Sequence, residues 1–131
     1  MAAGAASVLF NLPGYRVLEV MRDESGARTV TVETVQLEAA CPSCGVLSGT
    51  VHQRTLQRIR DVGFDGLVSV LWRKKRWRCN ESACRRRSFT EHTEQVPPRA
   101  RLTTRLSTRV LEAVTGEIRA VCRKRAFLRW V

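Results

Sequence analysis

The 131-residue sequence has little acidic charge and no long apolar run. Its 12 aspartates and glutamates are outnumbered by 23 lysines and arginines, and no apolar stretch approaches the roughly 20 residues that span a bilayer. The first residues lack the basic n-region of a secretory signal peptide. These absences argue against a membrane span, against export and against a disordered acidic chain, so we expect no membrane partner.

Sequence patterns of catalysis are missing as well. No carboxylates have the spacing of a metal pair, no Ser, His and Asp stand out as a triad, and no glycine-rich loop could cradle a phosphate. We therefore expect that the chain is not an enzyme and has no small-molecule substrate.

The positive charge is concentrated in the second part of the chain. The formal net charge is +11, with −2 over residues 1–50 and +13 over residues 51–131. This asymmetry is typical of proteins that bind nucleic acid or an acidic membrane, a solvated basic face being the alternative. Composition thus favours a soluble intracellular protein with a polyanionic partner.

Four of the five cysteines form two close pairs with C-x2-C and C-x4-C spacing, namely Cys41 with Cys44 and Cys79 with Cys84. Four thiolates from two short turns suit a tetrahedral Zn²⁺ site with Zn–S distances near ~2.3 Å. Pro42 presets its own φ, and Gly45 can adopt a positive φ, so both sulfurs of the first pair can face one ion. We predict a structural zinc ion, with an iron–sulfur cluster as the alternative.

Three further residues are weaker ligand candidates. His52 lies eight residues after Cys44, and we interpret it as a surface or DNA-facing residue. His92 has no partner at ligand spacing, and we assign it no role. Cys122 is distant from both cysteine pairs and is interpreted as a residue on a helix face.

Valine- and threonine-rich segments predict two β-hairpins, with turns at 23–26 and 63–66. Cysteine pairs at the ends of hairpins are typical of zinc ribbons. We predict an α+β fold whose first part, residues 9–95, is a small zinc-ribbon-like antiparallel β domain. Its strands are expected at residues 15–21, 28–37, 51–60 and 67–78.

The C-terminal part is predicted to be a short helical segment over residues 99–131. Residues 85–98 are expected to form a linker, because Pro97 and Pro98 cannot lie inside a helix or a central strand. Thr103 or Thr104 can cap a helix that runs to about residue 115. Gly116 is expected to interrupt it before a second helix, giving a partial helix-turn-helix or a dimerising helical hairpin.

The basic stretch around the second cysteine pair is the candidate DNA contact. A strand there would place charge on both faces and put Trp72 and Trp77 on opposite faces. We interpret the tryptophans as core residues and the charges as phosphate contacts. The candidate DNA-binding residues, including an arginine-lined face of the predicted helix, are Arg73, Lys74, Lys75, Arg76, Arg78, Arg85, Arg86, Arg87, Arg101, Arg105 and Arg109.

An ordered set of motifs over residues 9–120 resembles the N-terminal region of ISL-three-type bacterial insertion-sequence transposases. The motifs are Leu9-Phe10-x-Leu12-Pro13-Gly14, Cys41-Pro42-x-Cys44-Gly45, Val51-His52, Arg60-Asp61-Val62, Arg76-Trp77-Arg78-Cys79 and Cys84-x-Arg86-x-x-Phe89-Thr90-Glu91. In that family a zinc-binding domain precedes a helix-turn-helix and a nuclease-like catalytic domain. The resemblance implies that the four paired cysteines bind zinc and that the region recognises double-stranded DNA at transposon ends.

The sequence ends at Val131, before the position of the family's catalytic domain. We therefore expect a truncated transposase or a stand-alone DNA-binding piece, cytoplasmic in a bacterium and associated with the nucleoid. Its expected partners are double-stranded DNA and either itself or a full-length transposase. The alternatives are a protein-interaction (dimerisation) module and an RNA-binding zinc ribbon in which the two tryptophans stack on unpaired bases.

Overall fold

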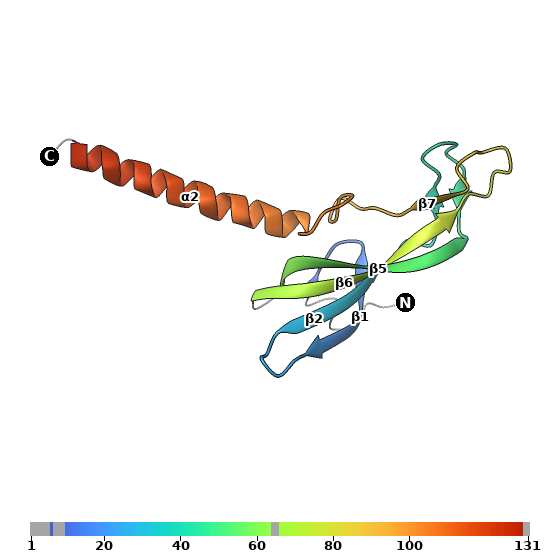
Figure 1. Ribbon diagram of the computed structural model, residues 1–131, viewed down its shortest axis with the longest axis horizontal. Helices are drawn as coiled ribbons and strands as arrows, with labels where there is room; N and C mark the ends of the chain where they lie inside the picture. Colours follow the sequence, from blue (N-terminus) through green and yellow to red (C-terminus); the bar gives the residue numbers. More distant parts are fainter. Residues whose placement is uncertain (1–5, 7–9, 64–65, 130–131) are drawn as a thin grey trace.

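The computed structural model describes residues 6, 10–63 and 66–129, and within the helix the side chains up to residue 117. A five-stranded sheet dominates the fold and a single long helix extends away from it (Figure 1). The expected α+β class with a small zinc-ribbon-like β part is confirmed. The elements are β1 (Tyr15–Arg22), β2 (Arg28–Thr34), β3 (Ala39–Ala40), β4 (Leu47–Ser48), β5 (Val51–Gly63), β6 (Gly66–Arg78), β7 (Ser88–Thr90) and α2 (Thr104–Arg129).

Strand β6 is the centre of the sheet. The strand order is β1-β2-β6-β5, and β7 pairs with the C-terminal part of β6. The hairpins β1–β2 and β5–β6 confirm the two predicted hairpins, although residues 64–65 of the second turn lie outside the described residues. The hairpins join through a parallel contact that local sequence patterns do not encode, in which Val30 lies opposite Val70 and Val32 opposite Trp72.

The main core lies on one face of the sheet. Side chains alternate between the two faces of a strand, so Val68, Val70 and Trp72 of β6 are buried together with Val30 and Val32 of β2. The chain before β1 and the segment after β7 cover this face. They contribute Phe10, Leu12 and Val96, whereas β1 contributes Tyr15 and β5 contributes Ile59.

A second, smaller core lies at the other end of β6. It contains Trp77, Phe89 and Cys41, all buried. Phe89 belongs to β7 and pairs with Trp77, so residues 88–90 are a strand and the predicted linker over 85–98 is wrong at these positions. The physical reason is that Phe89 completes the apolar surroundings of Trp77. Pro97 and Pro98 lie beyond this strand and do not prevent the contact.

Helix α2 begins where a buried hydrogen-bond network meets the sheet. Thr103 is fully buried and precedes the helix, confirming one of the two predicted caps; its hydroxyl donates to Asp61, and its carbonyl accepts from the amide of Ser107. Arg105, one residue into the helix, donates to both carboxylate oxygens of Asp61. These contacts tie the start of the helix to β5.

The predicted break at Gly116 is wrong, because α2 continues through it as one helix of 26 residues. A lone glycine lowers helix stability by about 1 kcal/mol relative to alanine but, unlike proline, causes no steric clash.

The side chain of Cys122 and residues 130–131 lie outside the described part, and the domain boundaries at 9–95 and 99–131 stay predictions. No helix in the described ranges is long and apolar enough to cross a membrane.

Candidate metal centre

The first cysteine pair sits on a tight turn between β3 and β4. The amide of Cys41 donates to the carbonyl of Val46 at 3.0 Å, and the amide of Gly45 donates to the carbonyl of Cys41 at 2.8 Å. Gly45 has a φ of 76°, as its position after the second cysteine predicted. The turn therefore directs Cys41 and Cys44 to the same side.

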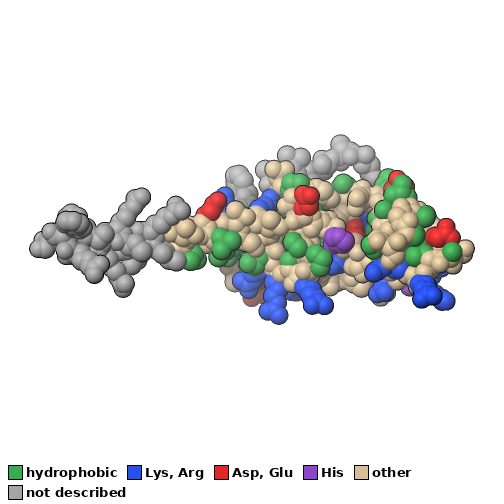
Figure 2. All heavy atoms as spheres, turned by 90° about the horizontal axis from the view of Figure 1, so that it is seen from above, with side chains coloured by type: hydrophobic (Ala, Val, Ile, Leu, Met, Phe, Trp, Pro, Cys, Tyr) green, Lys and Arg blue, Asp and Glu red, His purple; other side chains and the backbone are tan. Residues whose placement is uncertain are grey.

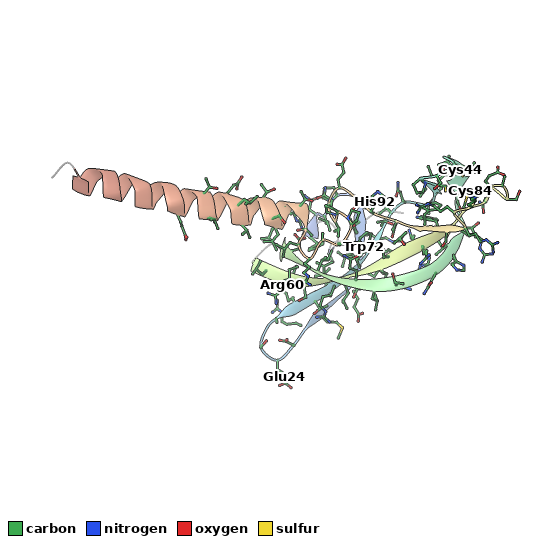
Figure 3. The ribbon with its side chains drawn as sticks, turned by 45° about the horizontal axis from the view of Figure 1, so that its top comes forward. Glu24, Cys44, Arg60, Trp72, Cys84 and His92 are labelled. Atoms are coloured by element: carbon green, nitrogen blue, oxygen red, sulfur yellow. The ribbon has the colours of Figure 1, made fainter. Side chains whose placement is uncertain are left out.

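The second cysteine pair lies in the loop between β6 and β7. The amide of Cys79 donates to the carbonyl of Arg87 at 2.9 Å, which closes the base of this loop. At its tip the amide of Cys84 donates to the carbonyl of Glu81 at 3.1 Å, and the Glu81 carboxylate accepts from the amide of Ala83. Cys44 and Cys84 come from the two different turns and lie near each other at one end of the molecule (Figure 3).

The four sulfurs surround one point. All four Sγ atoms lie within 4.8 Å of one another, and the pairs Cys41–Cys84 and Cys44–Cys79 are 3.9 and 3.5 Å apart. A tetrahedral zinc with Zn–S near ~2.3 Å requires sulfurs about 3.8 Å apart, so the donor set fits one zinc ion. An iron–sulfur cluster distributes its thiolates over several irons, and this tight arrangement fits it less well. Because all four positions are protein ligands, the site is structural.

The turns also favour thiolates. Burial raises the pKa of Cys41. Hydrogen bonds from the amides of Cys44 and Ser43 and from the adjacent thiols together outweigh burial and lower this pKa to about 7. The amide of Glu81 lowers the pKa of Cys79, whereas burial and the neighbouring cysteines raise it to about 12. The Cys41 thiol therefore ionises readily, whereas the Cys79 thiol resists ionisation, because two thiolates so close together repel each other. A bound divalent cation would offset that repulsion.

The second core supports the metal centre from below. Cys41 is 2% exposed and belongs to the same cluster as Trp77 and Phe89, with Cys79 and Cys84 packed against it. Across the two turns, Arg86 Nε donates to Ser43 Oγ at 2.8 Å. The ion and this small apolar cluster together join two turns that are far apart in sequence.

A comparison with protein families assigns this region. Residues 38–89 match the family model of the zinc-finger of transposase IS204/IS1001/IS1096/IS1165. This segment is similar to the zinc finger of that transposase family. It starts just before β3, contains all four clustered cysteines and ends in β7, about two fifths of the chain. No curated protein and no solved structure matches the chain significantly. The match and the cysteine cluster support the resemblance to an N-terminal zinc-binding transposase region, with zinc as its structural cofactor.

Most of the predicted DNA-contacting arginines lie on the surface around this zinc finger. Lysine and arginine side chains gather along one side of the molecule in Figure 2, where few acidic side chains are visible. Several are held in place by polar neighbours: Arg76 donates to Ser88, and Arg78 contacts His52 Nδ1 at 3.0 Å. The exposed members of the predicted set are Arg73, Arg76, Arg78, Arg85, Arg86, Arg87, Arg101 and Arg109.

Lys75 and Arg105 are not placed to contact DNA. Lys75 is 6% exposed, and its Nζ donates to the carbonyls of Thr34 and Gln36, so it holds the end of β2 and the residues that follow it. Arg105 is bound to the buried carboxylate of Asp61 and to two carbonyls of the N-terminal segment. The alternating pattern of a strand cannot show which part of a face another segment covers.

Lys74 has an intermediate position. It is half-buried, and its Nζ donates to Gln57 at 2.9 Å and lies 4.8 Å from the centre of the Trp72 ring. Burial lowers the pKa of Lys74, and the nearby charge of Glu91 partly opposes that shift. The charge of this lysine is therefore less available at the surface than that of the exposed arginines around it.

A concave surface of about 570 Å³ opens beside the second cysteine pair. Its lining includes the side chains of His52, Arg78 and Arg87, together with Ser82, Ser88, Glu81 and the two cysteines Cys79 and Cys84. Two guanidinium groups and hydroxyls at one concavity can bind a phosphate. His52 is thus a surface residue, and in the described residues the metal-ligating cluster contains only cysteines.

Three exposed arginines on β5 were missed by the sequence analysis, namely Arg54, Arg58 and Arg60. A signal for them was present: basic residues at even positions of a predicted strand alternate with Thr55, Gln57 and Ile59 and therefore share one face. The basic run at 73–87 is denser and therefore gives a stronger signal than this pattern.

Proposed function

We propose that this chain is a zinc-stabilised module that binds double-stranded DNA and recognises transposon ends. The observation that carries the proposal is the position of exposed arginines directly on and around the zinc finger of a transposase family. Arginine pairs with phosphate in a bidentate geometry, and a rigid support keeps several guanidinium groups aligned with one backbone. The zinc ion provides that rigidity where the protein core is small.

We also propose that the chain has no catalytic activity of its own and acts on the bacterial nucleoid. The sequence has no carboxylate group with the spacing of a two-metal nuclease, which supports this view. An assay of supercoiled plasmid with Mg²⁺ or Mn²⁺ is expected to show no nicking above buffer. Nicking that disappears when one carboxylate is replaced would contradict this part of the proposal.

The DNA-binding proposal is tested by titrating fluorescent duplex DNA over a range of salt concentrations. Neutralising about six phosphates predicts a slope of log K against log salt near −5. The variant Arg85→Gln/Arg86→Gln/Arg87→Gln should have a shallower slope, whereas Arg22→Gln, at the distant end of β1, should not. A wild-type slope near zero would refute the proposal.

One observation favours a protein-interaction role for α2 in addition. Val110, Leu111 and Val114 are 46, 67 and 49% exposed on a helix that extends away from the sheet (Figure 1). A second copy or a full-length transposase could cover this apolar surface. Sedimentation in high salt would detect such an association.

The RNA-binding alternative loses its support, because Trp72 and Trp77 are buried and cannot stack on bases.

A further inference from the structure

The open face of the β5–β6 hairpin carries a group of arginines that contribute neither to the four-cysteine metal centre nor to the core. The register places Leu56 opposite Arg73 and Arg58 opposite Leu71, so these side chains share one face. That face is opposite to the one where Ile59 and Trp72 enter the main core. We call it the arginine face and define it by Arg54, Arg58, Arg60 and Arg73 around Leu56 and Leu71.

In the described part of the chain, no protein group pairs with the guanidinium groups of the arginine face. Within the described residues, the side chains of Arg54, Arg58, Arg60 and Arg73 make no hydrogen bond or ion pair. Other arginines of the chain are engaged, as Arg105 is with Asp61. Four unpaired like charges on adjacent strands repel each other, and an anionic ligand would relieve this repulsion.

Acidic groups do not neutralise this face. Glu33 of β2 lies on the same face, but its carboxylate accepts two hydrogen bonds from Arg16. The charge of Arg16 therefore neutralises that of Glu33. Glu19 lies opposite Thr31 on β1, at the edge of the sheet farthest from β5. The half of the face formed by β5 and β6 therefore remains positive.

A shallow groove between the arginines suits an extended ligand. It has a volume of about 300 Å³ and is lined by Arg54 and Arg73 with Leu56, Leu71, Thr31 and Thr55. Leu56 is 66% exposed between two arginines, a position with no role in the core. Apolar groups flanked by guanidinium groups match deoxyribose and thymine methyl groups beside a row of phosphates.

The length of the face also matches a duplex. Arg54 and Arg60 are six residues apart on one strand, which corresponds to about 20 Å. The same length along B-DNA covers about six base pairs at 3.4 Å per step. Arg60 lies toward the end of the sheet from which α2 departs, whereas Cys44 and Cys84 lie at the other end (Figure 3). The arginine face thus extends along β5, within the matched segment, to an end of the sheet that is far from the four cysteines.

We propose that the arginine face binds the sugar-phosphate backbone of double-stranded DNA as a second contact surface, in addition to the arginines around the four cysteines. This inference rests on the proposed DNA-binding function and adds a surface to it. Arg54, Arg58 and Arg60 contact phosphates spaced along about six base pairs, Arg73 contacts the same backbone from β6, and Leu56 packs against the sugars.

The test compares two triple variants of equal charge change, Arg54→Gln/Arg58→Gln/Arg60→Gln and Arg85→Gln/Arg86→Gln/Arg87→Gln. Each is titrated with a 20-base-pair duplex over a range of salt, after zinc content and melting temperature have been matched to wild type. Loss of three phosphate contacts predicts that the β5 variant reduces the slope of log K against log salt by about 2.7. Leu56→Ala is expected to weaken binding with an unchanged slope.

The outcomes separate this inference from the proposed function. If wild type binds duplex DNA and only the Arg85→Gln/Arg86→Gln/Arg87→Gln variant has a shallower slope, the arginine face is refuted and the proposed function stands. If wild type does not bind DNA, the proposed function fails and this inference with it. Self-association that survives 1 M salt and is abolished by Leu56→Asp would show a protein interface instead, and would also refute the arginine face.

Discussion

Trp72 and Trp77 lie on the same strand and are buried on opposite faces of it. Trp72 belongs to the main core of the sheet, and Trp77 belongs to the small core beneath the four cysteines. Because the two positions differ by an odd number of residues, β6 must change its buried face between them. A single strand thus connects the sheet to the metal centre, and each half of the hairpin exposes a different face to solvent.

The first prediction concerns the division between the two cores. Trp77→Ala should lower the free energy of unfolding by about 3–5 kcal/mol and should accelerate zinc transfer to a chelator, because Cys79 and Cys84 pack against the small cluster that contains this indole. Trp72→Phe should leave the rate of zinc transfer unchanged. Zinc release followed with a colorimetric chelator measures both, and equal acceleration by the two variants would show that the cores are not separate.

A second prediction concerns the assignment of the ligands. Cys84→Ser should abolish tight zinc binding and unfold the turns at 41–48 and 79–88, since a structural zinc contributes about 10–16 kcal/mol of apparent binding energy. Cys122→Ser, a cysteine of α2, is the matched control and should retain one zinc per chain. Metal analysis after gel filtration decides the matter. Full zinc retention by the Cys84 variant would remove it from the ligand set.

A third prediction concerns the junction between sheet and helix. Asp61 is fully buried and binds both Thr103 and Arg105. Asp61→Ala leaves the charge of Arg105 uncompensated and removes a partner of the helix cap, so unfolding should become easier by about 3–5 kcal/mol. Glu112→Gln, on the exposed part of α2, should change stability little. Chemical denaturation monitored by circular dichroism provides the comparison; a neutral effect of Asp61→Ala would contradict the anchoring role.

A fourth prediction concerns alkaline pH. Burial raises the pKa of Tyr15, a hydrogen bond with Thr93 partly offsets this, and the charge of Glu91 adds to the rise. A folded-state pKa above the unfolded value of about 10 means that full stability is present below pH 10 and is lost as the pH rises above it. Tyr15 is the only tyrosine, so its ultraviolet difference spectrum reports it directly.

The control for this prediction is Tyr15→Phe. Its stability should fall less between pH 9 and 11 than that of wild type, and its spectrum should lack the phenolate band. A Tyr15 that titrates near pH 10 in the folded protein would show that its hydroxyl is not held in the core.

Local sequence patterns were sufficient for the metal centre and for both hairpins. The cysteine spacing and Gly45 identify the first turn, and alternating valines identify β2, because each of these features depends only on nearby residues. The parallel contact of β2 with β6 was not predictable in this way, since it joins Val32 to Trp72 across 40 positions. It depends on the packing of the whole chain.

The differences between prediction and structure have the same origin. Lys75 has the sequence surroundings of a DNA-contacting residue, yet the end of β2 and the residues after it cover this side chain. The carbonyls of Thr34 and Gln36 accept hydrogen bonds from its ammonium group. Residues 88–90 form a strand because Phe89 meets Trp77. Gly116 does not break α2, because a single residue of weak helix propensity cannot outweigh its helical neighbours. Each case depends on contacts or cooperativity beyond the local pattern.

The most direct measurement is X-ray absorption at the zinc edge, combined with metal analysis of the purified protein. One zinc per chain, with a first shell of four sulfurs at about 2.3 Å, is the result that the arrangement of Cys41, Cys44, Cys79 and Cys84 predicts. A folded protein without zinc, or a shell that contains nitrogen or oxygen in place of a sulfur, would contradict it.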